Sequence, residues 1–290
     1  MTQQKTCVCG TTGQELRYFA AGSDFCPNAP NPFTDDSAYG PAWTALIVSD
    51  ADPVGDFMGC NEARDLFFYR LGRSLPALER RAADFVRHEN GQGRNVIVAL
   101  PEDPELGAFL ERVLSETPGP HVVRATDPKC VVHSTSWECG KRILADGELK
   151  ALSLLMAEGA IKEPRLGHHG LCEPAEYADH INFAAHTSPW PEAVVSSNQK
   201  GRFVELDEPY RPGYRFYFDA HKIIRQGLDV RTGCHYFCVR HRLPLDGLLL
   251  EAIGLEDVDP EEKATWTPRS YAVEANRAFE ARRRLKEGIC

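Results

Sequence analysis

The sequence lacks long apolar runs, an N-terminal leader pattern and the glycine signatures of phosphate-binding loops. No apolar run approaches the roughly 20 residues that span a bilayer, and the N-terminal residues MTQQKT lack the apolar core of a signal peptide. The loops expected at residues 49–52 and 101–103 hold carboxylates in place of the glycines of a nucleotide-binding loop. We therefore expect a cytoplasmic or nuclear protein with no membrane partner.

Positive charge is also in short supply. The 290-residue chain has 33 Lys and Arg residues against 42 Asp and Glu residues, which gives a formal net charge of −9. This balance disfavours broad, nonspecific binding of nucleic acid, although a local basic pocket is compatible with it. With 42% hydrophobic and 26% charged residues, the composition is that of a globular protein.

The ten cysteines do not indicate a disulfide framework, because thiols stay reduced in the compartments expected for this chain. Zinc-ligand residue types cluster at Cys234, His235, Cys238 and His241. In a strand, however, residues 234 and 238 face one side and residues 235 and 241 face the other, so the four side chains cannot converge on one ion. We predict packed thiols and no bound metal.

Local patterns in residues 1–126 predict an irregular N-terminal segment followed by a small α/β domain. Apolar runs and helix-start signals place strands at residues 45–50 and 95–100, and helices at 61–70 and from residues 74 and 103 onward. Alternation of strand and helix favours some parallel pairing. Turn signals on both sides of residue 126 indicate a domain boundary there.

After the boundary, strands dominate and short helices separate them. Strands are expected at residues 131–136, 178–184, 201–206, 214–219 and 234–240, and helices at 138–147, 151–159, 220–227, 243–248 and 271–287. The whole chain is therefore predicted to be of the α+β class. We expect a strand-rich lobe over residues 127–255 and a C-terminal helix over residues 256–290.

The strand that ends in His133, Ser134 and Thr135 is the most informative stretch of this lobe. Its side chains place hydrogen-bonding groups at the mouth of a sheet, where backbone, water or a ligand must satisfy them. Hydroxyl groups at this position could also cap the helix that follows. All histidines except His88 and His121 lie between residues 133 and 241. This concentration favours the second half as the seat of chemistry, because imidazole titrates near neutral pH.

A series of short motifs follows the same order as in a known family. The motifs are HST at 133–135, ILADG at 143–147, HINFA at 180–184, VVSS at 194–197, FYFDA at 216–220, GLDVRT at 227–232 and RLPLD at 242–246. Residues 130–250 thereby resemble the catalytic lobe of the NAD-dependent RNA 2′-phosphotransferase family, within the wider ADP-ribosyltransferase fold. The resemblance implies a C-terminal, ADP-ribosyltransferase-like split β-sheet lobe with short helices, preceded by the small α/β domain.

The resemblance also implies roles for individual residues. Family members hold NAD with an H-x-T strand, which His133 and Thr135 match directly and Ser134 completes. They remove the 2′-phosphate left at an RNA splice junction, so NAD is implied as co-substrate and a phosphorylated RNA end or tRNA as partner. Arg231, near the family's Arg-Ser motif, is the implied phosphate ligand. His180 stands close to the position of a family arginine and is the second implied catalytic residue.

Departures from the family pattern keep other functions open. The family arginine before the second strand is absent from residues 176–180, and residues 233–238 lack the glutamate that related transferases use on DNA or protein acceptors. The chain is therefore predicted to be an NAD-dependent RNA 2′-phosphotransferase-like enzyme. The alternatives are a catalytically degenerate protein that binds a nucleotide or RNA end, and a mono-ADP-ribosyltransferase of protein or nucleic acid.

Overall fold

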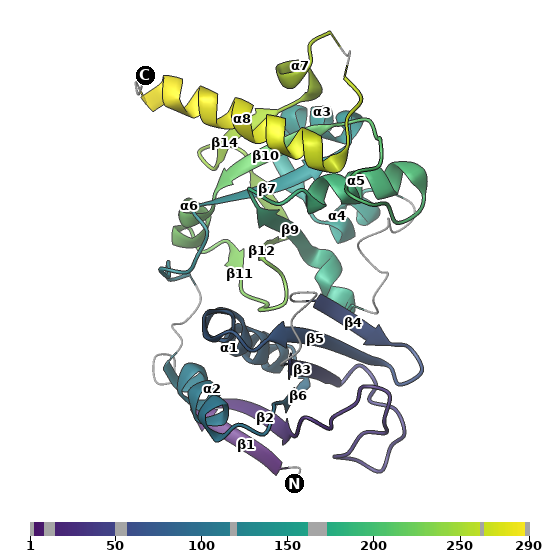
Figure 1. Cartoon of the computed structure of the whole chain (residues 1–290), viewed down its shortest axis with the longest axis vertical. Helices are drawn as coiled ribbons and strands as arrows, with labels where there is room; N and C mark the ends of the chain where they lie inside the picture. Colours follow the sequence, from purple (N-terminus) through teal and green to yellow (C-terminus); the bar gives the residue numbers. More distant parts are fainter. Residues whose placement is uncertain are drawn as a thin grey trace. The chain divides into compact units, whose positions relative to one another are not determined.

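The computed structural model describes residues 3–8, 15–49, 57–116, 121–161, 173–261 and 264–287, which form two compact units. Unit 1 comprises the chain up to Val122 together with residues 173–177 and 230–235, and unit 2 comprises the other described residues. Helices and strands are mixed throughout, so the predicted α+β class is confirmed (Figure 1). Within the described residues, no helix is both long and apolar enough to cross a membrane.

Unit 1 is built on one mixed sheet. Its elements are β1 (Gln3–Val8), β2 (Glu15–Ala21), β3 (Trp43–Ser49), β4 (Phe57–Asn61), β5 (Leu66–Gly72), α1 (Leu75–Gly91), β6 (Asn95–Ala99) and α2 (Pro104–Glu116). The strand order is β1-β2-β6-β3-β5-β4, with parallel pairs in the middle and antiparallel pairs at both edges. Leu46 and Val48 of β3 pack in the same hydrophobic cluster as residues of α1 and α2, whereas Ala45 and Ile47 pack in a second cluster. Both faces of β3 are therefore covered, which explains why its sequence is a continuous apolar run.

The helix expected at residues 61–70 is wrong. This segment contains the end of β4, a turn and most of β5, which pairs with β3 on one side and β4 on the other. The apolar run from Leu66 to Tyr69 fits a strand covered on both faces as well as it fits a helix, and pairing within the sheet decides between them. The helix expected to begin beside Pro76 is confirmed as α1.

Unit 1 is completed by two short segments that return from the second half of the chain. Tyr177, in the first segment, belongs to the same hydrophobic cluster as Phe85 of α1. Gly233, in the second, has a φ of +75°, and a Cβ atom there would lie 2.4 Å from the backbone nitrogen of Phe85. A glycine therefore allows this backbone to approach α1 closely. Turn signals in the sequence mark the first crossing between the units, near residue 126, but not these two returns.

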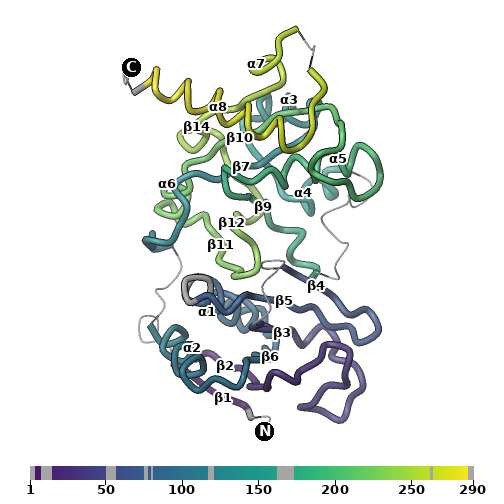
Figure 2. The backbone as a smooth tube through the Cα atoms, viewed as in Figure 1, coloured from purple at the N-terminus to yellow at the C-terminus, as the bar shows by residue number. Residues whose placement is uncertain are grey.

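Unit 2 is built on a sheet in which β7 is a central strand and pairs with its neighbours in antiparallel fashion. The elements of the second half are β7 (Cys130–Thr135), α3 (Trp137–Asp146), β8 (Glu148–Lys150), α4 (Leu152–Ala157), a 3-10 helix (Ala175–Asp179), β9 (His180–Ala185), α5 (Trp190–Lys200), β10 (Tyr214–Asp219), α6 (Ala220–Arg225), β11 (Asp229–Val230), β12 (Phe237–Arg240), β13 (Arg242–Pro244), β14 (Leu249–Ile253), α7 (Leu255–Val258) and α8 (Pro268–Glu287). The order in the larger sheet is β11-β12-β9-β7-β10-β14. In Figure 2 the chain path shows β7 between β9 and β10.

The two faces of this sheet pack in different clusters. Val131 of β7, Phe183 of β9 and Phe216 of β10 share one cluster, which we call the front face. Val132 of β7 shares the other with Tyr217 of β10 and with Tyr271 and Phe279 of α8, and we call this the back face. The C-terminal helix expected within residues 256–290 is α8, which covers the back face of unit 2 (Figure 1).

Some of the other helices and strands predicted for this half are confirmed, and others are wrong. The helix expected at 138–147 is confirmed as α3, which Ser136 caps by accepting from the Cys139 backbone nitrogen and which Gly147 ends at φ 70°. The strand expected at 201–206 is wrong, since no strand occurs there, and the helix expected at 243–248 is wrong, since β13 pairs with β8. The loop expected at residues 164–172 lies outside the described residues.

Candidate functional site

Strand β7 carries the three predicted nucleotide-binding residues at the middle of the unit 2 sheet. Successive side chains of a strand point to opposite faces, so His133 and Thr135 share the front face with Val131, and Ser134 shares the back face with Val132. Cross-strand pairing with β10 agrees, because Ser134 is the partner of Arg215. The H-x-T motif thus places His133 and Thr135 on the front face and Ser134 on the back face.

His133 is oriented by a backbone carbonyl of the neighbouring strand. Its Nδ1 atom lies 3.1 Å from the carbonyl oxygen of Asn182 on β9, and since a carbonyl can only accept, we assign the proton to Nδ1. The ring also makes an edge contact with Phe183, at 5.9 Å between centroids. Burial lowers the pKa of His133, and this outweighs the opposing effects of the Asn182 carbonyl and the Glu192 charge. At neutral pH the imidazole is therefore uncharged, and its Nε2 atom is an acceptor.

The front face beyond His133 presents aromatic rings and a cation. Tyr214, the cross-strand partner of Thr135, stacks on Trp137 with 4.9 Å between ring centroids and 19° between planes. The Nζ atom of Lys141 lies 4.5 Å from the Trp137 ring centroid. This close arrangement depends on Gly213, because a Cβ atom there would lie 2.0 Å from the carbonyl oxygen of Thr135. Thr135 therefore lies opposite Tyr214, whose ring stacks on Trp137, and an ammonium group lies over the Trp137 ring.

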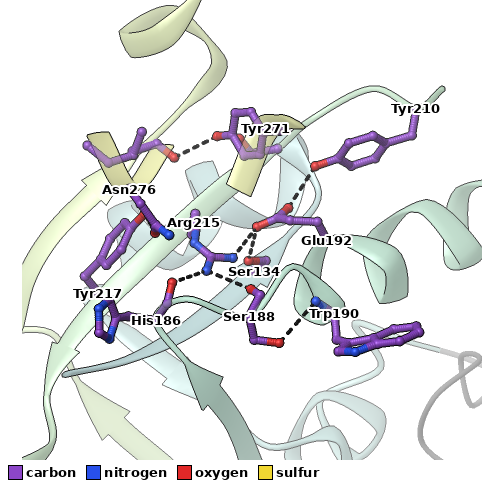
Figure 3. Close-up of polar contacts among 12 residues, drawn as sticks. Ser134, His186, Ser188, Trp190, Glu192, Tyr210, Arg215, Tyr217, Tyr271 and Asn276 are labelled. Atoms are coloured by element: carbon purple, nitrogen blue, oxygen red, sulfur yellow. Dashed lines mark hydrogen bonds and ion pairs between the residues drawn. The ribbon is translucent and has the colours of Figure 1, made fainter. Parts of the chain in front are cut away.

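The back face of β7 carries a buried ionic network (Figure 3). The Ser134 hydroxyl donates to Oε1 of Glu192 at 2.5 Å, and Nη1 of Arg215 donates to the same oxygen at 2.9 Å. The other carboxylate oxygen, Oε2, accepts from the Tyr210 hydroxyl at 2.9 Å. The side chains of Arg215 and Glu192 are 0% and 1% exposed. Three donors thus surround one carboxylate that water does not reach.

Arg215 extends the network to the chain that precedes α5. Its Nη2 atom donates to the carbonyl oxygens of His186 at 2.7 Å and Ser188 at 2.9 Å. The guanidinium carbon also lies 5.7 Å from the ring centroid of Tyr217, whose hydroxyl donates to Asn276 of α8 at 2.8 Å. A buried ion pair holds its place only when further hydrogen bonds reach both partners, and here they reach the carboxylate and the Nη2 atom of the guanidinium.

Arg215 and Glu192 were not identified from the sequence. A signal for Arg215 is present, because it is the charged residue in the apolar run of β10, and a buried arginine requires a buried partner. Nothing in the sequence marks Glu192 as that partner. It stands in the first turn of α5, where an acidic residue is usually a solvated helix end.

The two predicted catalytic residues belong to other segments than β7. His180 is the first residue of β9 and is 3% exposed. Because Phe183 points to the front face, alternation along β9 places His180 on the back face, away from His133. Arg231 belongs to unit 1, where its Nη2 atom donates to the carbonyl oxygen of Val122 at 2.7 Å. Within unit 2, His180 and His133 therefore face opposite sides of the sheet.

Unit 1 contains a second buried polar cluster. The Tyr177 hydroxyl donates to Glu89 at 2.6 Å, and Nε of Arg94 donates to the other oxygen of Glu89 at 2.5 Å. The thiol of Cys234 lies 3.4 Å from the Tyr177 hydroxyl. Burial raises the pKa of Cys234 to about 12, so this group is a thiol at neutral pH and a poor nucleophile. The cluster holds residues 173–177 and 230–235 in unit 1.

The cysteine and histidine residues considered as zinc ligands are divided between the units. Cys234 and His235 belong to unit 1, whereas Cys238 and His241 belong to unit 2. In the part of the chain that the structure describes, no group of three or more metal-binding side chains is close enough to hold an ion. Cys60 is disulfide-bonded, so the expectation of reduced thiols is wrong at this residue.

Comparisons with other proteins give no function for this site. No family model matches the sequence, and neither the curated proteins nor the solved structures give a match. The function is therefore inferred from the geometry of unit 2. That geometry consists of a front face with a neutral imidazole, a hydroxyl and stacked aromatic rings, and a back face with a buried carboxylate and guanidinium pair.

Proposed function

We propose that unit 2 is an NAD-binding lobe of the ADP-ribosyltransferase type. We further propose that the protein is an NAD-dependent RNA 2′-phosphotransferase-like enzyme, which transfers a 2′-phosphate to the ADP-ribose part of NAD and releases nicotinamide. The observation that carries the proposal is the placement of His133 and Thr135 on one face of β7, the strand between β9 and β10. The order of elements from β7 to β14 is compatible with the split sheet that the sequence resemblance implies.

The chemistry of the front face suits a nucleoside. A neutral His133 with Nε2 as acceptor can receive a hydrogen bond from a ribose hydroxyl, which a protonated imidazole cannot do. The Thr135 hydroxyl can donate or accept beside it. Lys141 supplies a cation on the helix that follows, where the negative charge of a pyrophosphate would be stabilised.

A second candidate function is binding of a nucleotide or RNA end without turnover. The observation that favours it is the position of His180, which is buried and lies on the back face of β9. A group in that position does not touch a ligand that His133 binds on the front face. If no other residue replaces it, the lobe would hold NAD but would not catalyse transfer.

One experiment distinguishes these proposals. The protein is incubated with NAD and an RNA oligonucleotide that carries an internal 2′-phosphate. Release of ADP-ribose 1″,2″-cyclic phosphate, together with dephosphorylated RNA and nicotinamide, supports the phosphotransferase. Measurable NAD binding with intact substrate supports the binding protein. ADP-ribose attached stably to protein or nucleic acid supports a mono-ADP-ribosyltransferase.

Two variants test whether the observed activity belongs to this site. His133→Ala should abolish NAD binding and any turnover, because it removes the acceptor on the front face. His241→Ala is the matched control, since that imidazole is about half exposed and lies 3.8 Å from Asp179 at the surface. Loss of activity in both variants, or in neither, would reject the assignment to His133.

A further inference from the structure

We propose that Glu192 is a positioning residue, which holds Ser134 on the back face of β7 so that His133 and Thr135 are presented on the front face. The proposal rests on the proposed function only for the identity of the ligand. It removes Ser134 from the set of residues that would contact NAD and gives it a different role. The hydroxyl is the link between the binding strand and the buried ion pair.

The position of Ser134 makes this link effective. It is the residue between His133 and Thr135, and its hydroxyl donates to Glu192 at 2.5 Å (Figure 3). A one-residue slip of a strand moves every side chain to the other face of the sheet. Such a slip of β7 would place His133 toward the back face and withdraw Ser134 from Glu192. The hydrogen bond therefore selects the register in which the motif faces the front.

The remaining contacts make Glu192 a rigid anchor. Its carboxylate is held by Arg215 from β10 and by Tyr210, so it does not need Ser134 for its own orientation. Arg215 is fixed in turn by the carbonyl oxygens of His186 and Ser188. A buried ion pair of this kind adds little stability over well-packed apolar residues, and its best-attested use is to specify one register.

The conservative variant Ser134→Ala tests the proposal, because it removes one hydroxyl and leaves the ion pair intact. Ser134→Thr restores a hydroxyl in a residue that suits a strand and should rescue the effect. Ser197→Ala is the matched control. Ser197 is a buried serine of unit 2, and its Oγ accepts from the Val204 backbone nitrogen at 3.2 Å, a contact separate from that between Ser134 and Glu192.

The first readout needs no ligand. The Nδ1 proton of His133 is held by the Asn182 carbonyl, and its exchange with water can be followed by NMR of ¹⁵N-labelled protein. We expect this exchange to be on the order of ten-fold faster in Ser134→Ala, because a hydrogen bond to a charged group is lost. The rate in Ser134→Thr and Ser197→Ala should match the wild type.

The second readout is NAD affinity, measured by calorimetry on the full chain. We expect Ser134→Ala to weaken binding on the order of ten-fold, with rescue by Ser134→Thr and no change in Ser197→Ala. Unchanged exchange at His133 in Ser134→Ala, or equal effects in Ser134→Ala and Ser197→Ala, would overturn the proposal. If the wild type does not bind NAD, the proposed function fails, and the exchange rate alone then decides the role of Glu192.

Discussion

Ser134 of β7 and Arg215 of β10 are cross-strand partners, and both donate to the same oxygen of the Glu192 carboxylate. This relationship connects the two faces of the unit 2 sheet. On the back face it fixes β7 to its neighbour, and on the front face it leaves His133 opposite Phe216 and Thr135 opposite Tyr214. Each of the following predictions tests one part of this arrangement or of the cluster in unit 1.

The buried ion pair is expected to respond strongly to loss of one partner. Arg215→Met leaves the Glu192 charge buried without its guanidinium and should lower the free energy of unfolding by about 3–5 kcal/mol. Urea denaturation followed by circular dichroism measures the loss. Arg202→Met removes an arginine paired with Glu208 at the surface and should leave the midpoint unchanged. Similar midpoints for the two variants would contradict the burial of the pair.

The stability of unit 2 should depend on pH through His133. Its folded-state pKa lies below the ordinary value of 6.5 because of burial, so the unfolded state binds more protons once the pH falls toward 6.5. Stability contributed by the neutral ring is fully present above pH 6.5 and is lost as the pH decreases below it. His133→Asn keeps a side-chain donor but does not titrate. Urea midpoints at pH 7.5 and 5.5 should therefore differ more for the wild type than for His133→Asn.

Glu173 should act in the opposite direction. Burial raises the pKa of this carboxyl from 4.5 to about 7 in the folded state, so the folded state binds the extra proton. The stability that Glu173 contributes is present below pH 4.5 and is lost as the pH rises through 7. Glu173→Gln should consequently be more stable than the wild type at pH 8 and equally stable at pH 4. A constant difference between the two proteins across this range would refute the assignment.

The returning segment 173–177 should contribute measurably to unit 1. Tyr177→Phe removes the donor to Glu89, a carboxylate with 0% exposure, and should cost about 1–3 kcal/mol of unfolding free energy. Tyr39→Phe is the control in the same unit, since the Tyr39 hydroxyl donates to a neutral carbonyl, that of Pro30, at 3.3 Å. Thermal unfolding of both variants, followed in parallel, should show the larger loss for Tyr177→Phe.

The parts of the fold that depend on local signals were predictable from the sequence. Helix α3 begins at the Ser136 cap and ends at Gly147, and both residues determine these ends through their own backbone and side chain. Helix α1 begins beside Pro76 for the same kind of reason. The front-face pairing of His133 with Thr135 also follows from strand periodicity, without knowledge of the neighbours.

The parts that depend on distant partners were not predictable. The sequence predicts a helix at the position of β5, because a short buried run is compatible with either element until β3 and β4 flank it. The return of Tyr177 and Gly233 to unit 1 involves sequence separations that no turn signal marks. The pairing of Arg215 with Glu192 could not be predicted either, since a carboxylate in the first turn of a helix is ordinarily solvated.

The most direct test of the account is a calorimetric titration of NAD into the wild type and into Thr135→Val. The hydroxyl of Thr135 is removed in this variant at nearly constant volume, and the back-face network of Ser134 is untouched. The account predicts saturable binding to the wild type and binding weakened on the order of ten-fold in Thr135→Val, because a polar contact to the ligand is lost. Absence of binding to the wild type, or equal affinity in the two proteins, would contradict the claim that the front face of β7 holds NAD.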